Sequence, residues 1–213
     1  MYQVTERTRV RRLPERASYD PAVVHAILDE GFVCHVGFVV DGQPYVIPTG
    51  YARVGETLYL HGSTGSRLGL RPGMDVCVTV TLLDGIVLAR SVFHHSFQYR
   101  SVMVLGRTRL VTDPAEKDAA LGALVEHFLP GRSADARPGN RRELVATAVL
   151  AVPLEEVSAK VRTGDPKDEE EDYGLPVWAG ILPLSLTPGE PVPDSRLDPT
   201  IPVPSYVKAW KRG

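Results

Sequence analysis

The chain has 213 residues, of which 43% are hydrophobic and 23% charged, and its formal net charge is −2. This balance is typical of a soluble globular protein, and a weakly acidic chain lacks the overall basic surface that binds duplex nucleic acid. No apolar run approaches the roughly 20 residues that cross a bilayer, and the two cysteines form no CxxC pair. We therefore expect a cytoplasmic protein that binds neither nucleic acid nor membranes.

The first predicted elements are a helix and a three-stranded meander. Asp20 is a suitable N-cap and Pro21 a suitable first residue for a helix that ends near Glu30. The pair Asp41-Gly42 favours a tight hairpin between two apolar strands, and a third strand, TLYLHG, continues the meander.

Further strands and a second helix are predicted in the rest of the chain. Asp84-Gly85 indicates another hairpin, between DVCVTVTLL and IVLARSVFHH, and YRSVMVLGRTRLV is expected as one long strand. A helix is expected from about Pro114 to Phe128, and LVATAVLAVPLEEVSAKVR as a last long strand, bent near Pro153. Five or six antiparallel strands at this spacing predict a barrel.

The end of the chain is predicted to be an arm. Seven of the eighteen prolines lie between Pro183 and Pro204, which favours extended chain over a packed element. We therefore expect one domain over residues 1–185 and a proline-rich arm over residues 186–213. Between Glu155 and Asp172 there are eight carboxylates against three basic side chains, which predicts a solvated acidic loop.

The stretch HGSTGSR, residues 61–67, is predicted to bind a phosphate. Gly62 and Gly65 permit backbone angles at which N–H groups converge on an anion, and Arg67 supplies a guanidinium. No acid occurs between Thr57 and Met74. A serine-capped turn without a ligand explains the same residues equally well. The P-loop, GxGxxG and GxSxG patterns are absent.

The histidines do not predict a metal site. His94 and His95 are adjacent on a run predicted as a strand, so their side chains would point to opposite faces and cannot chelate one ion. The other four histidines are scattered along the chain. We therefore expect no bound metal ion.

Three stretches occur in an informative order: PYVIPTGYARVGETLYLHGSTGSRL, YRSVMVLGRTRLV and YGLPVWAGILPL. With them the chain resembles the flavin-binding split-barrel proteins of the pyridoxamine 5′-phosphate oxidase superfamily. It is most similar to the branch of nitroimidazole-resistance-like and flavin-nucleotide-binding proteins. The resemblance covers about residues 20 to 185. It implies a mainly β fold with peripheral helices, an antiparallel six-stranded split β-barrel of the FMN-binding type.

The resemblance also implies where FMN would bind. The strand at residues 46–51 would run beside the flavin ring and ribityl chain, and Ser101 would bond the flavin from the adjoining strand. Leu68 stands where oxidase relatives have a lysine, so Arg100 or Arg71 is expected to supply the missing phosphate cation. Trp178 resembles a tryptophan that approaches the flavin from the partner subunit, with simple packing as the alternative. The expected cofactor-binding residues are Val46, Ile47, Pro48, Thr49, Gly50, Tyr51, His61, Gly62, Ser66, Arg67, Arg100, Ser101 and Trp178.

The function expected from the resemblance is that of an FMN-dependent oxidoreductase acting on an unknown small molecule, for example a nitroaromatic compound. Members of the superfamily are homodimers with flavins in the clefts between subunits, and the same is expected here. His61, His94 and His95 are the candidate proton donors, although packing or surface exposure is the better explanation for any one of them.

Other functions remain open. The C-terminal region lacks the Arg- and His-bearing motif with which pyridoxamine 5′-phosphate oxidases hold their substrate, so that activity is not expected. A flavin- or haem-binding module without turnover, and a reductase that uses the deazaflavin F420, are the alternatives.

Overall fold

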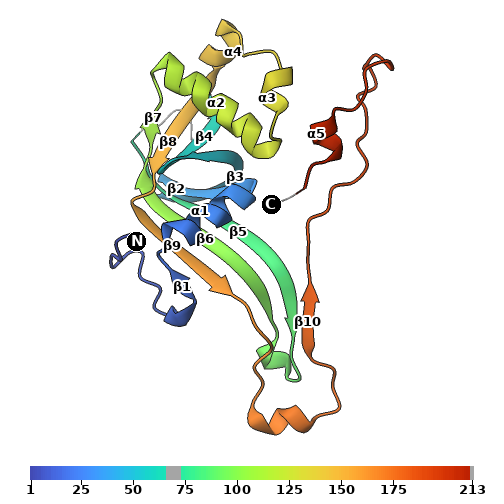
Figure 1. Cartoon of the computed structure of the whole chain (residues 1–213). Helices are drawn as coiled ribbons and strands as arrows, with labels where there is room; N and C mark the ends of the chain where they lie inside the picture. The colour runs from blue at the N-terminus through green and yellow to red at the C-terminus, as the bar shows by residue number, and fades with distance from the viewer. Residues whose placement is uncertain (66–72, 212–213) are drawn as a thin grey trace. The chain divides into compact units, whose positions relative to one another are not determined.

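The computed structural model describes residues 1–65 and 73–211, and these form two compact units made of interleaved segments (Figure 1). Unit 1 comprises Met1–Pro48, Val76–Gly106 and Leu154–Ser185, and unit 2 comprises Thr49–Asp75, Arg107–Pro153 and Leu186–Gly213. All the strand pairs given below are antiparallel. The expected fold class, mainly β with peripheral helices, is confirmed.

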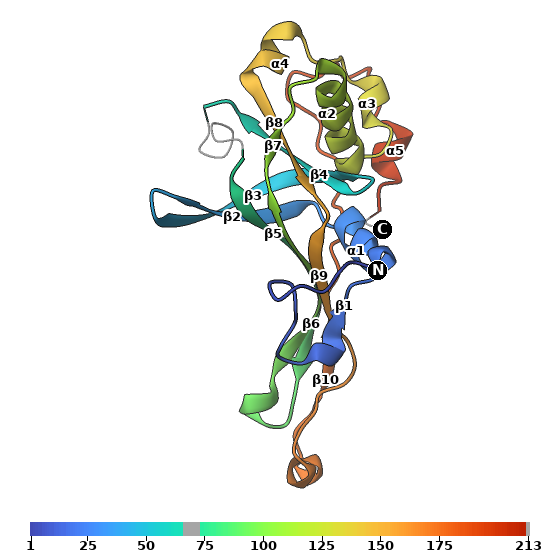
Figure 2. The ribbon, with the colours of Figure 1, turned by 90° about the vertical axis from the view of Figure 1, so that its left-hand side faces the viewer.

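Unit 1 is built on an antiparallel sheet (Figures 1 and 2). One edge of the long strand β5 faces β6, and the other pairs with β2 near its start and with β10 near its end. Helix α1 buries Val24, Ile27 and Leu28 and contacts β9. The strands, in their order across the sheet, are β1 (Ala17–Ser18), β9 (Glu156–Arg162), β6 (Ser96–Arg107), β5 (Asp75–Leu88) and β2 (Val33–Val40), with β10 (Gly180–Pro183) beside β5, and the helices are η1 (Pro14–Arg16), α1 (Pro21–Glu30), η2 (Val92–His94) and η3 (Glu170–Gly174).

Unit 2 has a smaller sheet with α2 against it. Figure 1 shows α2 lying across β8 and β4, and Ala120 of α2 belongs to a buried cluster with Val111, Val149 and Ala151. The strands, in their order across the sheet, are β3 (Gln43–Val54, which begins in unit 1), β4 (Thr57–Ser63), β8 (Thr147–Pro153) and β7 (Arg109–Leu110), and the helices are α2 (Pro114–Phe128), α3 (Arg132–Asp135), α4 (Arg141–Ala146) and α5 (Ser205–Lys208).

The local signals in the sequence are confirmed where one residue type controls the geometry. The Asp20 side chain accepts a hydrogen bond from Ala22 N at the start of α1, and the Asp113 side chain accepts one from Glu116 N in α2. Asp41 and Gly42 both have positive φ, 52° and 81°, as a tight hairpin turn between β2 and β3 requires.

The expected hairpin at Asp84-Gly85 is wrong, because β5 runs through both residues without a turn. Gly85 is buried and pairs with Pro183 of β10, and a Cβ there would lie 3.2 Å from Leu182 O. Gly85 therefore allows two strands to approach each other closely and does not form a turn. The connection to β6 comes later, through η2.

The two longest predicted strands are also divided. Thr108 lies between β6 and β7. Its N–H donates a hydrogen bond to Met74 O at 2.9 Å, and its carbonyl oxygen accepts one from Gly73 N at 2.8 Å. The second strand divides after Pro153 into β8, which pairs with β4, and β9, which pairs with β6. Its first residues, expected as strand, form the helix α4, which Asn140 and Glu143 begin with a capping box.

The C-terminal tail after Leu184 makes turns at residues 194–197 and 198–201 and ends in a short packed segment. Tyr206 of α5 donates its hydroxyl to Asp135 Oδ2 at 2.6 Å and accepts from Arg132 Nη1 at 3.2 Å. The indole N–H of Trp210 donates to Phe128 O at 3.1 Å. The tail therefore contacts α3 and the end of α2 within unit 2. The expected boundary at residue 185 stays a prediction.

Candidate functional site

The sheet of unit 1 has one apolar face and one polar face. Along β5 the residues of one face, such as Val78 and Val80, are buried, whereas the alternate residues Thr79 and Thr81 are not. On β6 and β9, Ser101 is paired directly with Lys160, so both lie on the same face. Hydroxyls and a cation thus stand on a sheet surface that α1 does not cover.

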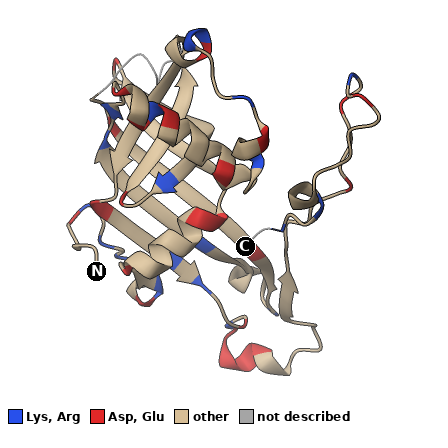
Figure 3. Ribbon diagram, turned by 45° about the horizontal axis from the view of Figure 1, so that its top comes forward, with Lys and Arg blue, Asp and Glu red and all other residues tan. Residues whose placement is uncertain are grey.

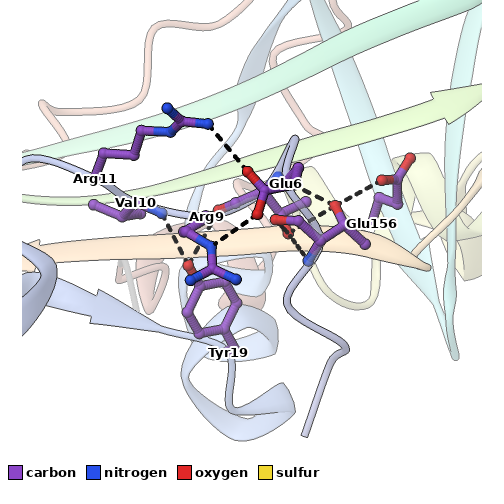
Figure 4. Close-up of polar contacts among 8 residues, drawn as sticks. Glu6, Arg9, Val10, Arg11, Tyr19 and Glu156 are labelled. Carbon is purple, nitrogen blue, oxygen red and sulfur yellow. Dashed lines mark hydrogen bonds and ion pairs between the residues drawn. The ribbon is translucent and has the colours of Figure 1, made fainter.

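The N-terminal segment is tied to the edge of this sheet by hydrogen bonds (Figure 4). The Tyr19 hydroxyl accepts from Val10 N at 3.0 Å and donates to Thr8 O at 3.1 Å. The Thr5 hydroxyl donates to Glu156 Oε1 at 2.8 Å, and the same carboxylate pairs with Arg7 at 3.0 Å. These contacts hold a chain terminus that would otherwise fray.

Between the N-terminal segment and the polar face lies a cavity of about 480 Å³. Its lining combines cations with hydroxyl groups, which are the side chains that bind phosphate. We call it the basic cavity. The cations that line it are Arg9, Arg11, Arg12 and Lys160, and the hydroxyls belong to Thr8, Thr79, Thr81, Ser101 and Ser158.

The positive charge of the basic cavity is only partly neutralised. Arg9 and Arg11 share the carboxylate of Glu6, at 3.5 Å and 3.1 Å (Figure 4). Lys160 Nζ donates to the backbone oxygen of Arg12 at 3.1 Å, and neither Lys160 nor the Arg12 guanidinium pairs with a carboxylate among the described residues. An anion in the cavity would supply the missing negative charge.

Of the two expected flavin-binding residues on β6, Ser101 lies in the basic cavity and Arg100 does not. Ser101 Oγ donates to Lys160 O at 3.3 Å. Arg100 alternates to the other face, where its guanidinium donates to Asp84 at 2.8 Å and 3.0 Å and to both oxygens of Glu30. These two carboxylates raise the pKa of Arg100. They also compete with the phosphate-binding role that the sequence suggests for it.

The expected flavin strand, residues 46–51, changes character along its length. Val46 in unit 1 is exposed, whereas Tyr51 in unit 2 is fully buried with its ring centroid 5.1 Å from that of His127. A Cβ at Gly50 would lie 2.6 Å from Phe128 Cζ, so the absence of a side chain there accommodates α2. Ile47 and Thr49 are half-buried, and Pro48 is exposed. Any contact of Tyr51 with a ligand therefore involves its backbone.

His61 and Gly62 lie on β4 in unit 2, beside the end of the expected flavin strand. Tyr51 is paired with Leu60, which places the two segments on adjacent strands, and His61 and Gly62 are paired with Val149 and Ala148 of β8. Beyond β4, Gly65 N donates to Ser63 Oγ at 3.2 Å, as in a serine-capped turn. Ser66, Arg67, Leu68 and Arg71 lie outside the described residues, so the phosphate turn stays a prediction.

His94 and His95 do not lie on a strand, contrary to expectation, because β5 ends at Leu88 and η2 follows. Ser91 caps η2 by accepting a hydrogen bond from Phe93 N. His94 Nε2 lies 3.5 Å from Glu169 Oε1, and His95 Nδ1 lies 2.9 Å from Ser91 O. The two rings therefore have different partners within one turn.

Asp168 fastens the acidic loop to the turn that carries these histidines. Its fully buried carboxylate accepts from Arg90 N at 2.9 Å, from Ser91 N at 3.2 Å and from Arg90 Nη1 at 3.1 Å. We call this arrangement the Asp168 clamp. Other carboxylates of the loop gather on η3 (Figure 3). The sequence did not single out Asp168, because only its contacts distinguish it from its acidic neighbours.

The Asp168 clamp makes stability depend on pH. Burial alone would raise the pKa of Asp168, but the hydrogen bonds from Arg90 and Ser91 outweigh it and hold the pKa below its ordinary value. A lowered pKa means that the clamp stabilises the fold above about pH 4 and is lost as the pH falls through the folded-state value. We expect Asp168→Asn to lower the melting temperature by several degrees at pH 7.

The effect of Asp168→Asn should shrink toward about pH 2, where the wild-type carboxyl is also neutral. Asp165→Asn, which changes an exposed carboxylate in the same loop, is the control and should melt like the wild type at each pH. Melting curves followed by circular dichroism measure the difference. A pH-independent difference would contradict the assignment of the clamp to an ionised Asp168.

Trp178 lies before β10 and is 68% exposed. Its ring covers the backbone of Gly180, where a Cβ would be 2.9 Å from Trp178 Cη2. The ring is thus held in place and open to solvent on its other side. Its contact with a flavin of a partner subunit stays a prediction.

Three other observations bear on the chemistry of the described residues. Burial raises the pKa of the Cys34 thiol to about 12 and also raises that of the half-buried Cys77, so both thiols are poor nucleophiles at neutral pH. Within residues 1–65 and 73–211, no three His, Cys, Asp or Glu side chains form a metal-binding group. No helix in that part of the chain is both long and apolar enough to cross a membrane.

Sequence reasoning missed the arginines of the basic cavity. The signal was present, since TRVRR at residues 8–12 has three arginines in five positions. The position of this segment against the sheet depends on its contacts with Tyr19 and Glu156.

Known proteins are similar to this chain in sequence and in structure. The sequence model of the pyridoxamine 5′-phosphate oxidase family matches residues 20–161. No curated protein sequence matches the chain. The N-terminal arginines therefore precede the part of the chain that the family model covers.

Several solved structures are similar to the chain. The flavocytochrome Anf3 from Azotobacter vinelandii is 42% identical, with 98% of each chain covered and a TM-score of 0.92. An FAD- and haem-binding protein from Mycobacterium smegmatis is 38% identical, with 91% of this chain and 96% of that chain covered and a TM-score of 0.86. A 5-nitroimidazole antibiotic resistance protein from Bacteroides thetaiotaomicron, described as putative, is 24% identical, with 68% of this chain and 86% of that chain covered and a TM-score of 0.58. This likeness supports the fold alone.

Proposed function

The chain belongs to the pyridoxamine 5′-phosphate oxidase family, and from this premise we propose that it is a redox protein that binds FAD together with a haem. Two similar proteins that match nearly the whole chain are described as a flavocytochrome and as an FAD- and haem-binding protein. The observation in this chain that carries the proposal is the basic cavity around Ser101. It offers the cations and hydroxyls that a nucleotide phosphate needs.

The donor set of the basic cavity fits FAD better than FMN. The sequence suggests FMN, which has one phosphate, whereas FAD has a pyrophosphate and an adenosine in addition to the flavin. Arg9, Arg11 and Arg12 lie outside the residues matched by the family model, so they add cations to the binding groups common to the family. The Arg12 guanidinium and Lys160 are the groups that we propose for the pyrophosphate.

The residues near η2 fit a haem. A haem requires an axial ligand, commonly histidine, and an apolar surface. Residues 92–97 provide exposed apolar side chains together with an exposed histidine, His95. When bound, a flavin supplies one- and two-electron transfer and a haem one-electron transfer. The role of the protein chain is to bind and orient both groups and to restrict water around them.

We also propose that the protein is a homodimer. The unit 1 sheet and its hairpin expose Val33, Val39 and Val46, which a second copy would cover. Light scattering on the purified protein measures its molar mass, and the value for two chains supports this proposal. A monomeric mass in the presence of FAD would contradict it.

The FAD proposal is tested at Arg12. We expect Arg12→Ala to weaken FAD binding by about 10- to 100-fold, since a charge-assisted hydrogen bond to phosphate contributes about 1.5–3 kcal/mol. The affinity for FMN should fall less. Titration of the apoprotein with each flavin, followed by fluorescence, measures both constants, and raising the salt concentration should reduce the difference between wild type and variant.

The matched control is Arg7→Ala. Arg7 belongs to the same N-terminal segment, but its guanidinium pairs with Glu156 and does not line the basic cavity. In the variant, the bond from Thr5 to Glu156 and the two bonds of the Tyr19 hydroxyl still hold the segment. We expect this variant to bind FAD like the wild type. An equal loss of FAD affinity in both variants would point to a general effect of charge. An Arg12→Ala protein with wild-type FAD affinity would overturn the role proposed for the basic cavity.

The proposed reaction is oxidation of a reduced nicotinamide donor by the loaded protein. Hydride transfer to a flavin requires no nucleophilic side chain, in agreement with a chain that has none in a recognisable arrangement. Consumption of NADH or NADPH with candidate acceptors, nitroaromatic compounds included, tests it. No turnover with any acceptor would favour a binding module, which the sequence also allows.

A further inference from the structure

The turn between β5 and β6, together with the start of β6, exposes an unusual group of large apolar side chains. Val92 is 91% exposed, Phe93 87% and Phe97 52%. Such residues are normally buried, and their concentration within residues 92–97 indicates a surface that a ligand or partner covers. The turn also contains His95, which is exposed.

The hydrogen bond of His95 determines its tautomer. Ser91 O is a carbonyl oxygen and can only accept, so His95 Nδ1, 2.9 Å away, carries the hydrogen. In the neutral ring Nε2 then has the lone pair, and it makes no hydrogen bond with the described residues. A histidine that ligates a metal typically has this arrangement, with one nitrogen donating to a carbonyl and the other free for the metal.

The Asp168 clamp fixes the carbonyl that orients His95. Arg90 N and Ser91 N both donate to the Asp168 carboxylate, so the backbone at Ser91 is held on its N–H side. Arg90 also lies over the Tyr173 ring, 5.0 Å from its centroid. The imidazole is therefore held by a chain of contacts that begins on another segment of unit 1.

The other histidines lack this combination of a fixed ring and a free nitrogen. His25 is bonded to the Tyr2 hydroxyl, His127 lies against Tyr51, and His94 Nε2 faces Glu169. His35 and His61 are exposed, but no hydrogen bond orients their rings within the described chain. All six histidines of the chain lie in the described residues.

We propose that His95 Nε2 is an axial ligand of the haem iron and that Val92, Phe93 and Phe97 contact the porphyrin. This inference rests on the proposed haem binding and adds to it the residue and the surface. A planar apolar group laid on the turn would cover the exposed side chains, while the imidazole supplies the iron ligand.

Titration of the FAD-loaded protein with ferric haem tests the proposal, with the Soret band and the electron paramagnetic resonance spectrum as readouts. We expect His95→Ala to bind haem at least tenfold more weakly and to lose the wild-type signals of an imidazole-ligated iron. We expect His95→Gly to recover them when free imidazole is added. His35→Ala and His94→Ala are the controls and should keep the wild-type spectra.

The outcomes separate the two levels of the proposal. If the wild type binds no haem at one equivalent per chain, the proposed function fails in its haem part. If the wild type binds haem and His95→Ala retains both haem affinity and spectra, only the assignment of His95 is overturned. Loss of the signals of an imidazole-ligated iron in His35→Ala or His94→Ala would overturn that assignment equally. Retained FAD binding in His95→Ala shows that the variant is folded.

Discussion

Tyr51→Ala should lower the free energy of unfolding by about 3–5 kcal/mol, the usual cost of removing a large buried ring. Tyr51 is fully buried on β3, is paired with Leu60 of β4 and lies against His127 of α2. Its removal opens a cavity where the helix α2 meets the sheet. Chemical denaturation of wild type and variant, with equal m-values, measures the loss.

Tyr51→Phe is the matched control, because it keeps the ring. We expect it to lose much less stability than Tyr51→Ala and to bind FAD like the wild type, since a buried side chain leaves only backbone groups to meet a ligand. If Tyr51→Ala were nearly as stable as the wild type, the ring would not belong to the core of unit 2. If Tyr51→Phe lost FAD binding, the hydroxyl would have a role that its burial argues against.

Arg100→Met should cost about 2–3 kcal/mol of stability. Removing one partner from a buried ion pair typically costs about 3–5 kcal/mol, because the other charge is left uncompensated, and we reduce this value because the Arg100 side chain is 30% exposed. The substitution leaves Glu30 and Asp84 facing the same space without a cation. Denaturation at neutral pH measures the loss.

A second variant shows where that cost arises. If uncompensated carboxylates cause it, Arg100→Met in a Glu30→Gln, Asp84→Asn background should recover much of the lost stability, because no charge is then left unpaired. If the stability is not recovered in that background, the loss caused by Arg100→Met arises mainly from the packing of the aliphatic stem of the arginine.

Arg100 also allows the sequence-derived role and the structural role to be distinguished. The resemblance suggests that Arg100 provides a phosphate cation, whereas its contacts make it the centre of an ion-pair cluster on the opposite face from Ser101. In a variant that remains folded, a large loss of FAD affinity would support the first role. Unchanged affinity together with reduced stability would support the second.

Features that depend on neighbours in the chain were determined by the sequence itself. The caps at Asp20 and Asp113, the turn at Asp41-Gly42 and the alternation that makes the chain mainly β are each decided within a few residues. The resemblance to the family was also evident from the order of residues alone. The three stretches that indicate it are separated by fixed lengths of chain, which do not depend on their contacts in the fold.

Tertiary structure alone decided which segments meet. Gly85 lies within a strand because β10, almost a hundred residues later, pairs with it, and a local pattern has no information about that distant partner. In the same way Asp168 is distinguished from its acidic neighbours only by Arg90 and Ser91, and the N-terminal arginines line a cavity only because Tyr19 and Glu156 hold them there. Long-range contacts arise from the packing of the whole chain, whereas propensities describe one segment at a time.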